Sequence, residues 1–367
     1  FLNQSHTNLP DCSNSSALKK LKTLVDMHVP EITMPMLCWL AVAPLRTLFR
    51  EFPILHLSGT SGCGKTTLTN QMLYFFSGSR INSNLTTTTP YAISAHFMAS
   101  NGFPIWFDEY RPGARDDAKK TLDQLLRDTY TGQVSTKGSM NKNRAEVTQI
   151  LTDTPVVITG EDTLSEKSHI DRSIILNIPM EGKNPDALDA LDWESPFAKN
   201  YLQWLYRNQL TTEVKLPDIK DSDNLSGRQY HNFQVLQYGY DLLIDYVEYL
   251  QEGKTNWDLP PRSWGVALRD ARTASEENPI VELIRWAYEA EEKAVFLLED
   301  DTKLGISTIE LMRLQNAPWG PRLPLPFEKH TAFGRWLEDH LGATKERVFY
   351  NGKQRRVHVI DFEKVIL

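Results

Sequence analysis

The stretch from Pro53 to Leu68, PILHLSGTSGCGKTTL, constrains the fold more than any other part of the chain. The apolar residues 54–57 lead into a glycine-rich loop at 59–64, and Lys65 opens a helix-compatible run. This order of strand, loop and helix start is typical of a phosphate-binding loop. The glycines let backbone N–H groups face phosphate oxygens, with the positive end of the helix behind them. The stretch therefore predicts an α/β fold that binds a nucleotide.

Individual residues of this loop have distinct expected roles. Lys65 would reach the β- and γ-phosphates of ATP, and the Thr66 hydroxyl would ligate Mg²⁺. Cys63 fills a free position in the loop, and we interpret it as a small filler rather than a reactive thiol. The expected nucleotide-binding residues are Gly59, Thr60, Ser61, Gly62, Cys63, Gly64, Lys65, Thr66 and Thr67.

A second apolar run ends in two acids. Residues 103–107 read FPIWF, and Asp108 and Glu109 follow them. An ATPase needs such a pair beside its phosphate-binding loop. Asp108 would hold Mg²⁺, directly or through water, and Glu109 would orient and deprotonate the attacking water. The pattern is common by itself, but its place downstream of the loop predicts ATP hydrolysis.

A segment rich in cations and free of acids follows a predicted helix. Residues 132–144 read GQVSTKGSMNKNR, and Gly138 and Asn141 permit a tight turn, which predicts a β-hairpin. The cations of this hairpin are Lys137, Lys142 and Arg144. They are placed to bind a phosphodiester backbone. The alternative is an ordinary solvated hairpin.

Two further apolar runs, 154–159 and 174–178, predict strands of the same sheet. A polar residue at the tip of the first strand can sense the γ-phosphate and position water. Thr159 is the first candidate for this role, and Glu161 is the second. Arg172 precedes the second strand, where a ring-forming ATPase presents an arginine finger to the γ-phosphate of its neighbour. A surface ion pair with the preceding aspartate is the alternative role for this arginine.

The rest of the chain is predicted to be mostly helical and to end in a hairpin. Residues 186–253 have a helical pattern, and a proline-containing segment at 256–262 is interpreted as a linker. Near the end, Asn351-Gly352 lies between alternating strands, which is a strong hairpin signal. Helices followed by a basic hairpin are typical of a winged-helix module, whose wing would lie along DNA phosphates or contact a protein. The cations of the wing are Lys353, Arg355 and Arg356.

Composition excludes several classes of protein. The chain has 367 residues and a net charge of −7, so any DNA contact must come from local basic patches. The longest apolar stretch, 32–49, contains two prolines and an arginine and does not predict a membrane span. The three cysteines lack the spacing of a metal site and suit a reducing cytoplasm. The chain opens on Phe1 rather than Met, so we expect a fragment of a longer protein.

The order of these parts resembles the AAA+ superfamily of ATPases. The shared parts are a helical collar, the Gly-Lys-Thr loop, the strand ending in Asp-Glu, the basic hairpin, a strand with a polar tip and an arginine before the next strand. Within the superfamily, residues 17–180 are most similar to the superfamily-three helicases of small viruses and the helicase parts of phage and mobile-element primase–helicases. That family has Thr-Ser-Asn where this chain has Thr159-Gly160-Glu161.

The resemblance implies a domain organisation. The fold class is α/β, with a three-layer AAA+ core of the ASCE P-loop type, an N-terminal helical collar, an α-helical region and a C-terminal winged-helix-like domain. In the family, the basic hairpin enters the pore of a hexamer and holds single-stranded DNA. The expected divisions are a flexible tail or linker at 1–16, the collar at 17–52, the ATPase core at 53–182, the helical region at 183–262 and the winged-helix-like domain at 263–367.

Together these patterns predict an ATP-driven, Mg²⁺-dependent DNA helicase or translocase. It would act as a homo-oligomeric ring, expected to be a hexamer, on single-stranded or forked DNA during replication of a phage or mobile element. We expect it in the cytoplasm of a bacterial host, without membrane contact, alone or within a larger primase–helicase. One alternative is a non-translocating AAA+ switch that acts on a protein or transcription partner. Another is a kinase built on the same loop, which Glu109 disfavours because activated water would waste ATP.

Overall fold

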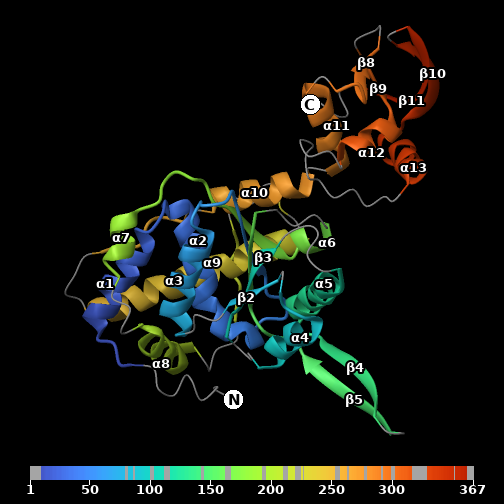
Figure 1. The fold of residues 1–367 in the computed structure, drawn as a ribbon. Coiled ribbons are helices and arrows are strands. Elements are labelled where there is room, and N and C mark those ends of the chain that lie inside the picture. The colour runs from blue at the N-terminus through green and yellow to red at the C-terminus, as the bar shows by residue number, and fades with distance from the viewer. Residues whose placement is uncertain are drawn as a thin grey trace. The chain divides into compact units, whose positions relative to one another are not determined.

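Five parallel strands form the central sheet of the first part of the chain (Figure 1). They are β1 (Ile54–Ser58), β2 (Asn82–Asn84), β3 (Ile105–Tyr110), β6 (Val156–Gly160) and β7 (Ser173–Asn177). Their order across the sheet is β2-β3-β6-β1-β7, and every neighbouring pair is parallel. The four longer strands are largely buried, as is typical of a parallel sheet covered on both faces. Parallel strands end at one edge, so the loop after β1 lies close to the ends of β3 and β6.

The computed structural model divides the chain into two units, Phe1–Ala274 and Ser275–Leu367. The residues that it describes are 10–78, 82–85, 87–99, 103–110, 116–141, 144–161, 167–191, 196–209, 214–219, 225, 227–252, 257–262, 264–276, 279–290, 292–298, 302–315, 329–350 and 352–361. Within these ranges, no helix combines the length and the apolar character needed to span a membrane.

Helices cover both faces of the sheet. They are α1 (Asn14–Val25), α2 (Pro30–Val42), the 3₁₀ helix η2 (Ala43–Leu48), α3 (Lys65–Ser77), α4 (Pro90–Ala99), α5 (Asp116–Thr131), α6 (Lys167–Ile170), α7 (Pro185–Asp189), α8 (Ala198–Gln209), α9 (Gly227–Gln251) and α10 (Gly265–Glu276). Helices α1, α2, α3, α8 and α9 share one hydrophobic cluster with one face of the sheet, and α4 and α5 pack on the other face. The alternation of a strand explains this division, because Leu55 and Leu57 belong to the first cluster and Ile54 to the second.

Helices α2 and α9 are far apart in the sequence and approach each other closely in space. A Cβ added at Gly239 in α9 would overlap the carbonyl oxygen of Cys38 in α2, so only glycine permits this approach. Trp39 in α2 also donates its indole N–H to the carbonyl of Pro53 at 2.8 Å. These contacts tie the N-terminal helices to the start of the strand that leads into the glycine-rich loop.

The predicted basic hairpin is formed by β4 (Val134–Asn141) and β5 (Arg144–Leu151). The two strands pair antiparallel from Val134 with Leu151 to Asn141 with Arg144. The expectation that Gly138 helps to form the turn is wrong, since Gly138 lies within β4 and pairs with Val147. The strands therefore continue further than the glycine suggested, and the connection at 142–143 lies outside the described residues.

The second unit consists of helices and a small antiparallel sheet. Its elements are α11 (Pro279–Glu289), β8 (Val295–Leu297), β9 (Lys303–Ile306), α12 (Thr308–Gln315), α13 (His330–Leu341), β10 (Thr344–Tyr350) and β11 (Lys353–Asp361). The strand order is β10-β11-β9-β8. Leu283, Leu311 and Phe333 bring the three helices into one core with β9 and β11. The predicted final hairpin is confirmed, because Tyr350 pairs with Lys353.

The division between the units falls after Ala274, later than the Arg262 boundary expected from the sequence. All but the last two residues of helix α10 belong to the first unit, in whose hydrophobic cluster Trp264 and Ala267 are buried. The segment interpreted as a linker also packs on that unit, since Tyr240 donates its hydroxyl to the carbonyl of Pro260 at 3.1 Å.

Candidate functional site

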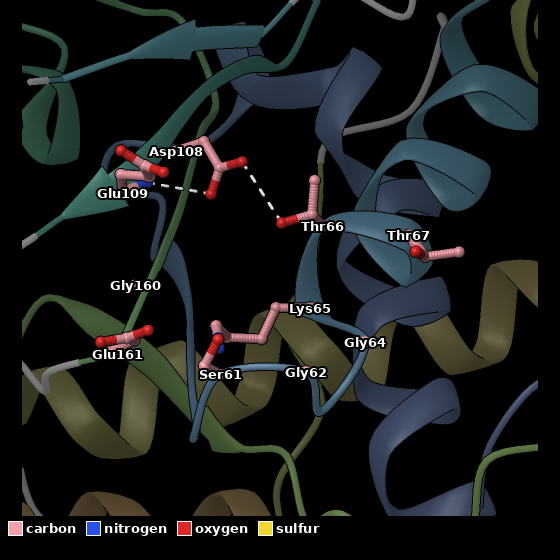
Figure 2. Close-up of a pocket in the computed structure, with 10 residues that line it drawn as sticks. All are labelled: Ser61, Gly62, Gly64, Lys65, Thr66, Thr67, Asp108, Glu109, Gly160 and Glu161. Atoms are coloured by element: carbon pink, nitrogen blue, oxygen red, sulfur yellow. Dashed lines mark hydrogen bonds between the residues drawn. The ribbon is translucent and has the colours of Figure 1, made fainter.

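The loop between β1 and α3 borders a cavity of about 310 Å³ at the carboxyl edge of the sheet (Figure 2). Three segments contribute to it, namely this loop with the start of α3, the end of β3 and the end of β6. Its lining residues are Ser61, Gly62, Gly64, Lys65, Thr66, Thr67, Asp108, Glu109, Gly160 and Glu161. The structure therefore brings the glycine-rich loop and the two acids, which are separate in the sequence, to one site.

The backbone of the loop has the geometry that its glycines predict. Gly62 has a φ of +80° and Gly64 a φ of +96°, values that L side chains rarely adopt. A Cβ added at Gly59 would lie 2.7 Å from the carbonyl oxygen of Ile178, so this position also requires glycine. Gly64 is the N-cap of α3 and provides no capping side chain. The first N–H groups of α3 are therefore available to an anion.

Lys65 is held against its own loop. Its ammonium group donates to the carbonyls of Gly59 at 2.6 Å and Thr60 at 3.0 Å. The thiol of Cys63 lies 3.5 Å from the same nitrogen and is fully buried, in agreement with the expected role of a small filler. The cation thus lies at the cavity with acceptors that a phosphate group could replace.

Strand β3 contains a bulge at the two acids. Phe107 pairs with Ile158 and Tyr110 pairs with Gly160, so Asp108 and Glu109 lie opposite a single residue of β6. Glu109 has a φ of +60°, which is uncommon for a residue with a side chain. Consecutive residues of a regular strand point to opposite faces, whereas here both acids line one cavity. The sequence showed the two acids but not the irregularity that directs both of them into the site.

The carboxylate of Asp108 has a different set of contacts on each oxygen. Oδ1 accepts the backbone N–H of Glu109 at 2.9 Å and the hydroxyl of Thr159 at 2.5 Å. Oδ2 accepts the hydroxyl of Thr66 at 3.3 Å. Figure 2 shows Asp108 between Glu109 and Thr66. Thr66 and Asp108, the two residues predicted to bind metal, are therefore in direct contact.

These oxygen atoms suit a magnesium ion. Mg²⁺ prefers oxygen ligands and usually takes one or two protein groups together with phosphates and water. Thr66 and Asp108 provide such a pair at the mouth of the loop. Among the described residues, no group of three or more histidine, cysteine or acidic side chains could hold a metal ion by itself. The donors fit an ion that is bound together with a nucleotide.

The two candidate sensor residues lie in different environments. Thr159 is fully buried behind Asp108 and does not line the cavity. Glu161 is exposed and lines it. Gly160, between them, cannot carry a side chain because a Cβ there would overlap the carbonyl of Tyr110. Glu161 therefore lies in the site, whereas Thr159 contacts Asp108 and the core of the sheet.

A second cavity of about 240 Å³ adjoins the loop and has no acid among its lining residues. It shares Gly62, Gly64 and Thr67 with the first cavity. Its other lining residues come from the loop itself, from the segment before α2, from α3 and from the segment at α7: Cys63, Met27, His28, Leu68, Lys183, Asn184, Pro185 and Leu188. Sequence reasoning missed this cavity, because no motif marks residues that meet only in the folded chain.

His28 and Lys183 are the two ionisable side chains in the lining of this second cavity that can carry positive charge. Lys183 donates its ammonium group to the carbonyl of Gly62 in the loop. His28 accepts the N–H of Val29 on Nδ1 at 2.9 Å. Burial lowers the pKa of His28, and the charge of Lys183 lowers it further.

Arg172 does not lie at the cavity of its own chain. Its carbonyl accepts the N–H of Ile54 at the amino end of β1, and the glycine-rich loop follows the other end of this strand. The guanidinium group lies 5.7 Å from the ring centre of Tyr130 and donates to the carbonyl of Ser168. Burial lowers the pKa of Arg172, as does repulsion from Arg228. No ion pair joins this arginine to the preceding aspartate, although the structure describes both side chains.

The predicted nucleic-acid contacts are only partly described. Lys142 lies outside the described residues, and at Lys137, Arg144 and Lys353 the structure describes the backbone alone, within β4, β5 and β11. Arg355 forms an ion pair with Glu310 at 3.2 Å and lies over the ring of Tyr350 at 5.8 Å. Arg356 is exposed.

Arg356 lines a further cavity, of about 340 Å³, within the second unit. Its lining residues are Ser307, Thr308, Ile309, His330, Thr331, Gly334, Arg335, Lys345, Arg356, Val357 and His358. The first turns of α12 and α13 border it, together with the β10–β11 hairpin. Lys345 pairs with Glu338 at 2.5 Å. Arg335 and Arg356 both line this cavity, and neither forms an ion pair with a carboxylate of the described residues.

Comparisons with known proteins identify the fold. No protein-family model and no curated protein matches the sequence. The solved structure of Cch from SCCmec type IV, described as an active helicase, aligns over 98% of this chain and 72% of its own, with a TM-score of 0.51 and 16% identity. The apo C-terminal region of NrS-1 aligns over 98% of this chain and 78% of its own, with a TM-score of 0.37 and 12% identity. The first likeness shows that the chain has a helicase-like α/β fold.

Proposed function

We propose that the first unit binds ATP with Mg²⁺ and hydrolyses the ATP. The observation that carries this proposal is the 3.3 Å contact between Thr66 Oγ1 and Asp108 Oδ2, which joins two separate motifs at one cavity. Lys65 and Glu109 line the same cavity. A glycine-rich loop alone would bind a nucleotide. The acids add a ligand for the metal ion and a base for water.

Each group has one task in the proposed reaction. The backbone N–H groups at the start of α3 bind the phosphates, and Lys65 exchanges the carbonyls of its loop for the β- and γ-phosphates. Thr66 and Asp108 hold the metal ion, which supplies neutralisation of the charge on the phosphates. Glu109 orients the attacking water and takes its proton.

The second cavity, which adjoins the glycine-rich loop, is the proposed site of the adenine base. It adjoins the phosphate cavity at Gly62, Gly64 and Thr67, so one nucleotide can extend across both. The side chains of Met27 and Leu188 offer apolar surface to the faces of the base.

The proposed ATPase belongs to the AAA+ type and works as a DNA helicase or translocase in replication of a phage or mobile element. The position of β6 between β1 and β3 supports this type, because the resemblance places a sensor strand there. A homo-oligomeric ring, expected to be a hexamer, would let Arg172 reach the γ-phosphate of a neighbour, and its distance from its own cavity suits that role. The fold shared with a helicase favours this function over a kinase.

DNA is proposed to contact the β4–β5 hairpin through Lys137, Lys142 and Arg144, and also the winged-helix-like second unit. In the second unit, the cavity with Arg335 and Arg356 is a better site for a phosphate than Arg355. The charge of Arg355 is already balanced by Glu310, whereas those two arginines have no such partner among the described residues. We therefore place the main phosphate contact of this unit at the cavity.

The test measures ATP hydrolysis with and without single-stranded DNA, together with strand displacement on forked DNA and the mass of the protein with ATP and Mg²⁺. We expect DNA to stimulate hydrolysis, and Lys65→Ala to abolish it. Hydrolysis that is indifferent to DNA would favour the protein-directed switch instead. A monomer in every condition, without strand displacement, would contradict the ring.

A further inference from the structure

The hydroxyl group of Thr159 lies in a chain of hydrogen bonds that ends on Asp108. The indole Nε1 of Trp106 lies 2.8 Å from Thr159 Oγ1, and this oxygen lies 2.5 Å from Asp108 Oδ1. Trp106 is 3% exposed and Thr159 is 0% exposed, so water does not compete for either group. The chain therefore connects the core of the sheet to the carboxylate at the edge of the cavity.

The chemistry of the three groups determines the direction of this chain. An indole N–H can only donate, so Thr159 Oγ1 accepts from Trp106. The single proton of the hydroxyl is then directed to the carboxylate of Asp108, which accepts it in a charge-assisted hydrogen bond. No proton of Thr159 remains for a phosphate oxygen. This arrangement argues against Thr159 as the sensor of the γ-phosphate.

The bulge in β3 adds a second donor to the same carboxylate oxygen. The N–H of Glu109 donates to Asp108 Oδ1 at 2.9 Å instead of to a neighbouring strand. The left-handed φ of Glu109 has a cost of about 1 kcal/mol or more, and such conformations persist where surrounding contacts stabilise them. Two donors on Oδ1 fix the rotation of the carboxylate and direct Oδ2 toward Thr66.

We propose that Thr159, oriented by Trp106, is a positioning residue that holds Asp108 Oδ2 toward the metal ion. The inference rests on the proposed ATPase function, because it assigns a role to residues behind the proposed magnesium ligand. Removal of the hydroxyl leaves Oδ1 with one donor, and the carboxylate can then turn away from Thr66. Outer contacts of this kind change metal affinity by about 10- to 100-fold in other proteins.

The test compares the binding of ADP by the 367-residue chain across a titration of Mg²⁺ and in EDTA. Thr159→Val removes the hydroxyl at nearly constant volume. We expect the half-saturating Mg²⁺ concentration to rise at least about tenfold, with ADP affinity in EDTA unchanged. Thr159→Ser keeps the hydroxyl and should stay close to the wild type. Trp106→Phe removes the donor that orients the hydroxyl, together with part of a buried ring, and should give a smaller increase.

Two matched variants separate this effect from general loss of packing. Thr154→Val removes another buried hydroxyl, just before β6, that donates to the carbonyl of Phe97 at 3.3 Å. Trp264→Phe changes a buried indole in another part of the same unit. If both Thr159→Val and Trp106→Phe keep the wild-type half-saturating Mg²⁺ concentration, the role of Thr159 is overturned, while the proposed ATPase function is not affected. If the ADP affinity of the wild-type chain does not depend on Mg²⁺, both the role of Thr159 and the proposed ATPase function are overturned.

Discussion

Two cavities in this molecule combine cations with the starts of helices, and they differ in what else surrounds them. At the sheet edge, Lys65 shares its cavity with Asp108, Glu109 and Glu161. In the second unit, the lining around Arg335 contains cations, histidines and hydroxyl groups but no acid among the described residues. Both cavities suit an anion. Only the first lining contains carboxylates, which could hold a magnesium ion and take a proton from water.

This difference shows that phosphate binding and phosphate chemistry place separate demands on a site. Binding needs positive charge and free N–H groups, and both cavities provide them. Chemistry also needs acids placed near that positive charge, and in the first cavity a bulge in β3 supplies them. The comparison can be tested by removing the acids from one cavity and the cations from the other.

The largest effect is expected from Glu109→Gln. This variant should leave a first cavity that binds ATP but does not hydrolyse it. The amide cannot take the proton of the attacking water, so kcat for ATP hydrolysis should fall about 100-fold or more. ATP affinity should stay within about twofold of the wild type, because the loop and Lys65 are intact. Steady-state hydrolysis and equilibrium ATP binding measure the two quantities. Glu181→Gln, an exposed glutamate outside the cavity, serves as the control. If Glu109→Gln kept full ATP hydrolysis, the proposal that the acids distinguish the first cavity from the cavity in the second unit would be wrong.

An intermediate effect is expected from replacing Arg335 and Arg356 together by Gln. Each phosphate contact that is lost should lower the slope of log affinity against log salt by about 0.7 to 0.9. DNA affinity should therefore fall and depend less on salt, while ATP hydrolysis without DNA stays unchanged. Fluorescence anisotropy with a labelled oligonucleotide at several salt concentrations measures this. Arg313→Gln, an exposed arginine of α12 outside the cavity, is the matched control. Equal losses in both variants would show that the cavity has no special role.

The smallest effect concerns pH and the stability of the second unit. Burial lowers the pKa of His358, although Glu338 opposes this, and the charges of Lys345 and Arg356 lower it further. A folded pKa below the unfolded value of about 6.5 means that protonation favours the unfolded state. Stability should therefore be full above pH 6.5 and fall as the pH decreases below it. We expect the melting temperature to fall by a few degrees on acidification.

His358→Gln provides the check on this pH dependence. The variant should lose part of the decrease in melting temperature between pH 7 and pH 5.5, because the titrating imidazole is absent. Calorimetric scans of both proteins at several pH values measure the difference. The same decrease in the variant would assign the pH dependence to other groups.

The parts that could be predicted from sequence are those set by local patterns. The glycine-rich loop, the strand before Asp108, the helix before the basic hairpin and the final hairpin each follow from residues close together in the chain. Their physical causes are local too, such as backbone freedom at Gly62 and Gly64 or the alternation of a strand. The helicase-like α/β fold follows from the order of these elements.

The parts that could not be predicted depend on pairing between distant segments. The bulge at Asp108 exists because β3 shifts its register against β6, and the sequence of β3 alone does not show this. The position of Thr159 at the tip of a strand predicts a sensor, whereas its hydrogen bond with Trp106 depends on the same pairing between β3 and β6. Gly138 suggested a turn, but a glycine also fits within a strand when its neighbours pair well.

The close approach of α2 and α9 at Gly239 has a consequence for how the chain folds during synthesis. Helix α2 ends at Val42 and α9 begins at Gly227, so the contact closes a long loop that contains the entire central sheet. Contacts between such distant segments form late, because the chain must first lose the entropy of closing the loop. While the ribosome is still adding residues before α9, one face of α2 has no partner. A shortened chain that ends before Gly227 should therefore expose the face of α2 at Cys38 and Val42 and aggregate, even though its glycine-rich loop is complete.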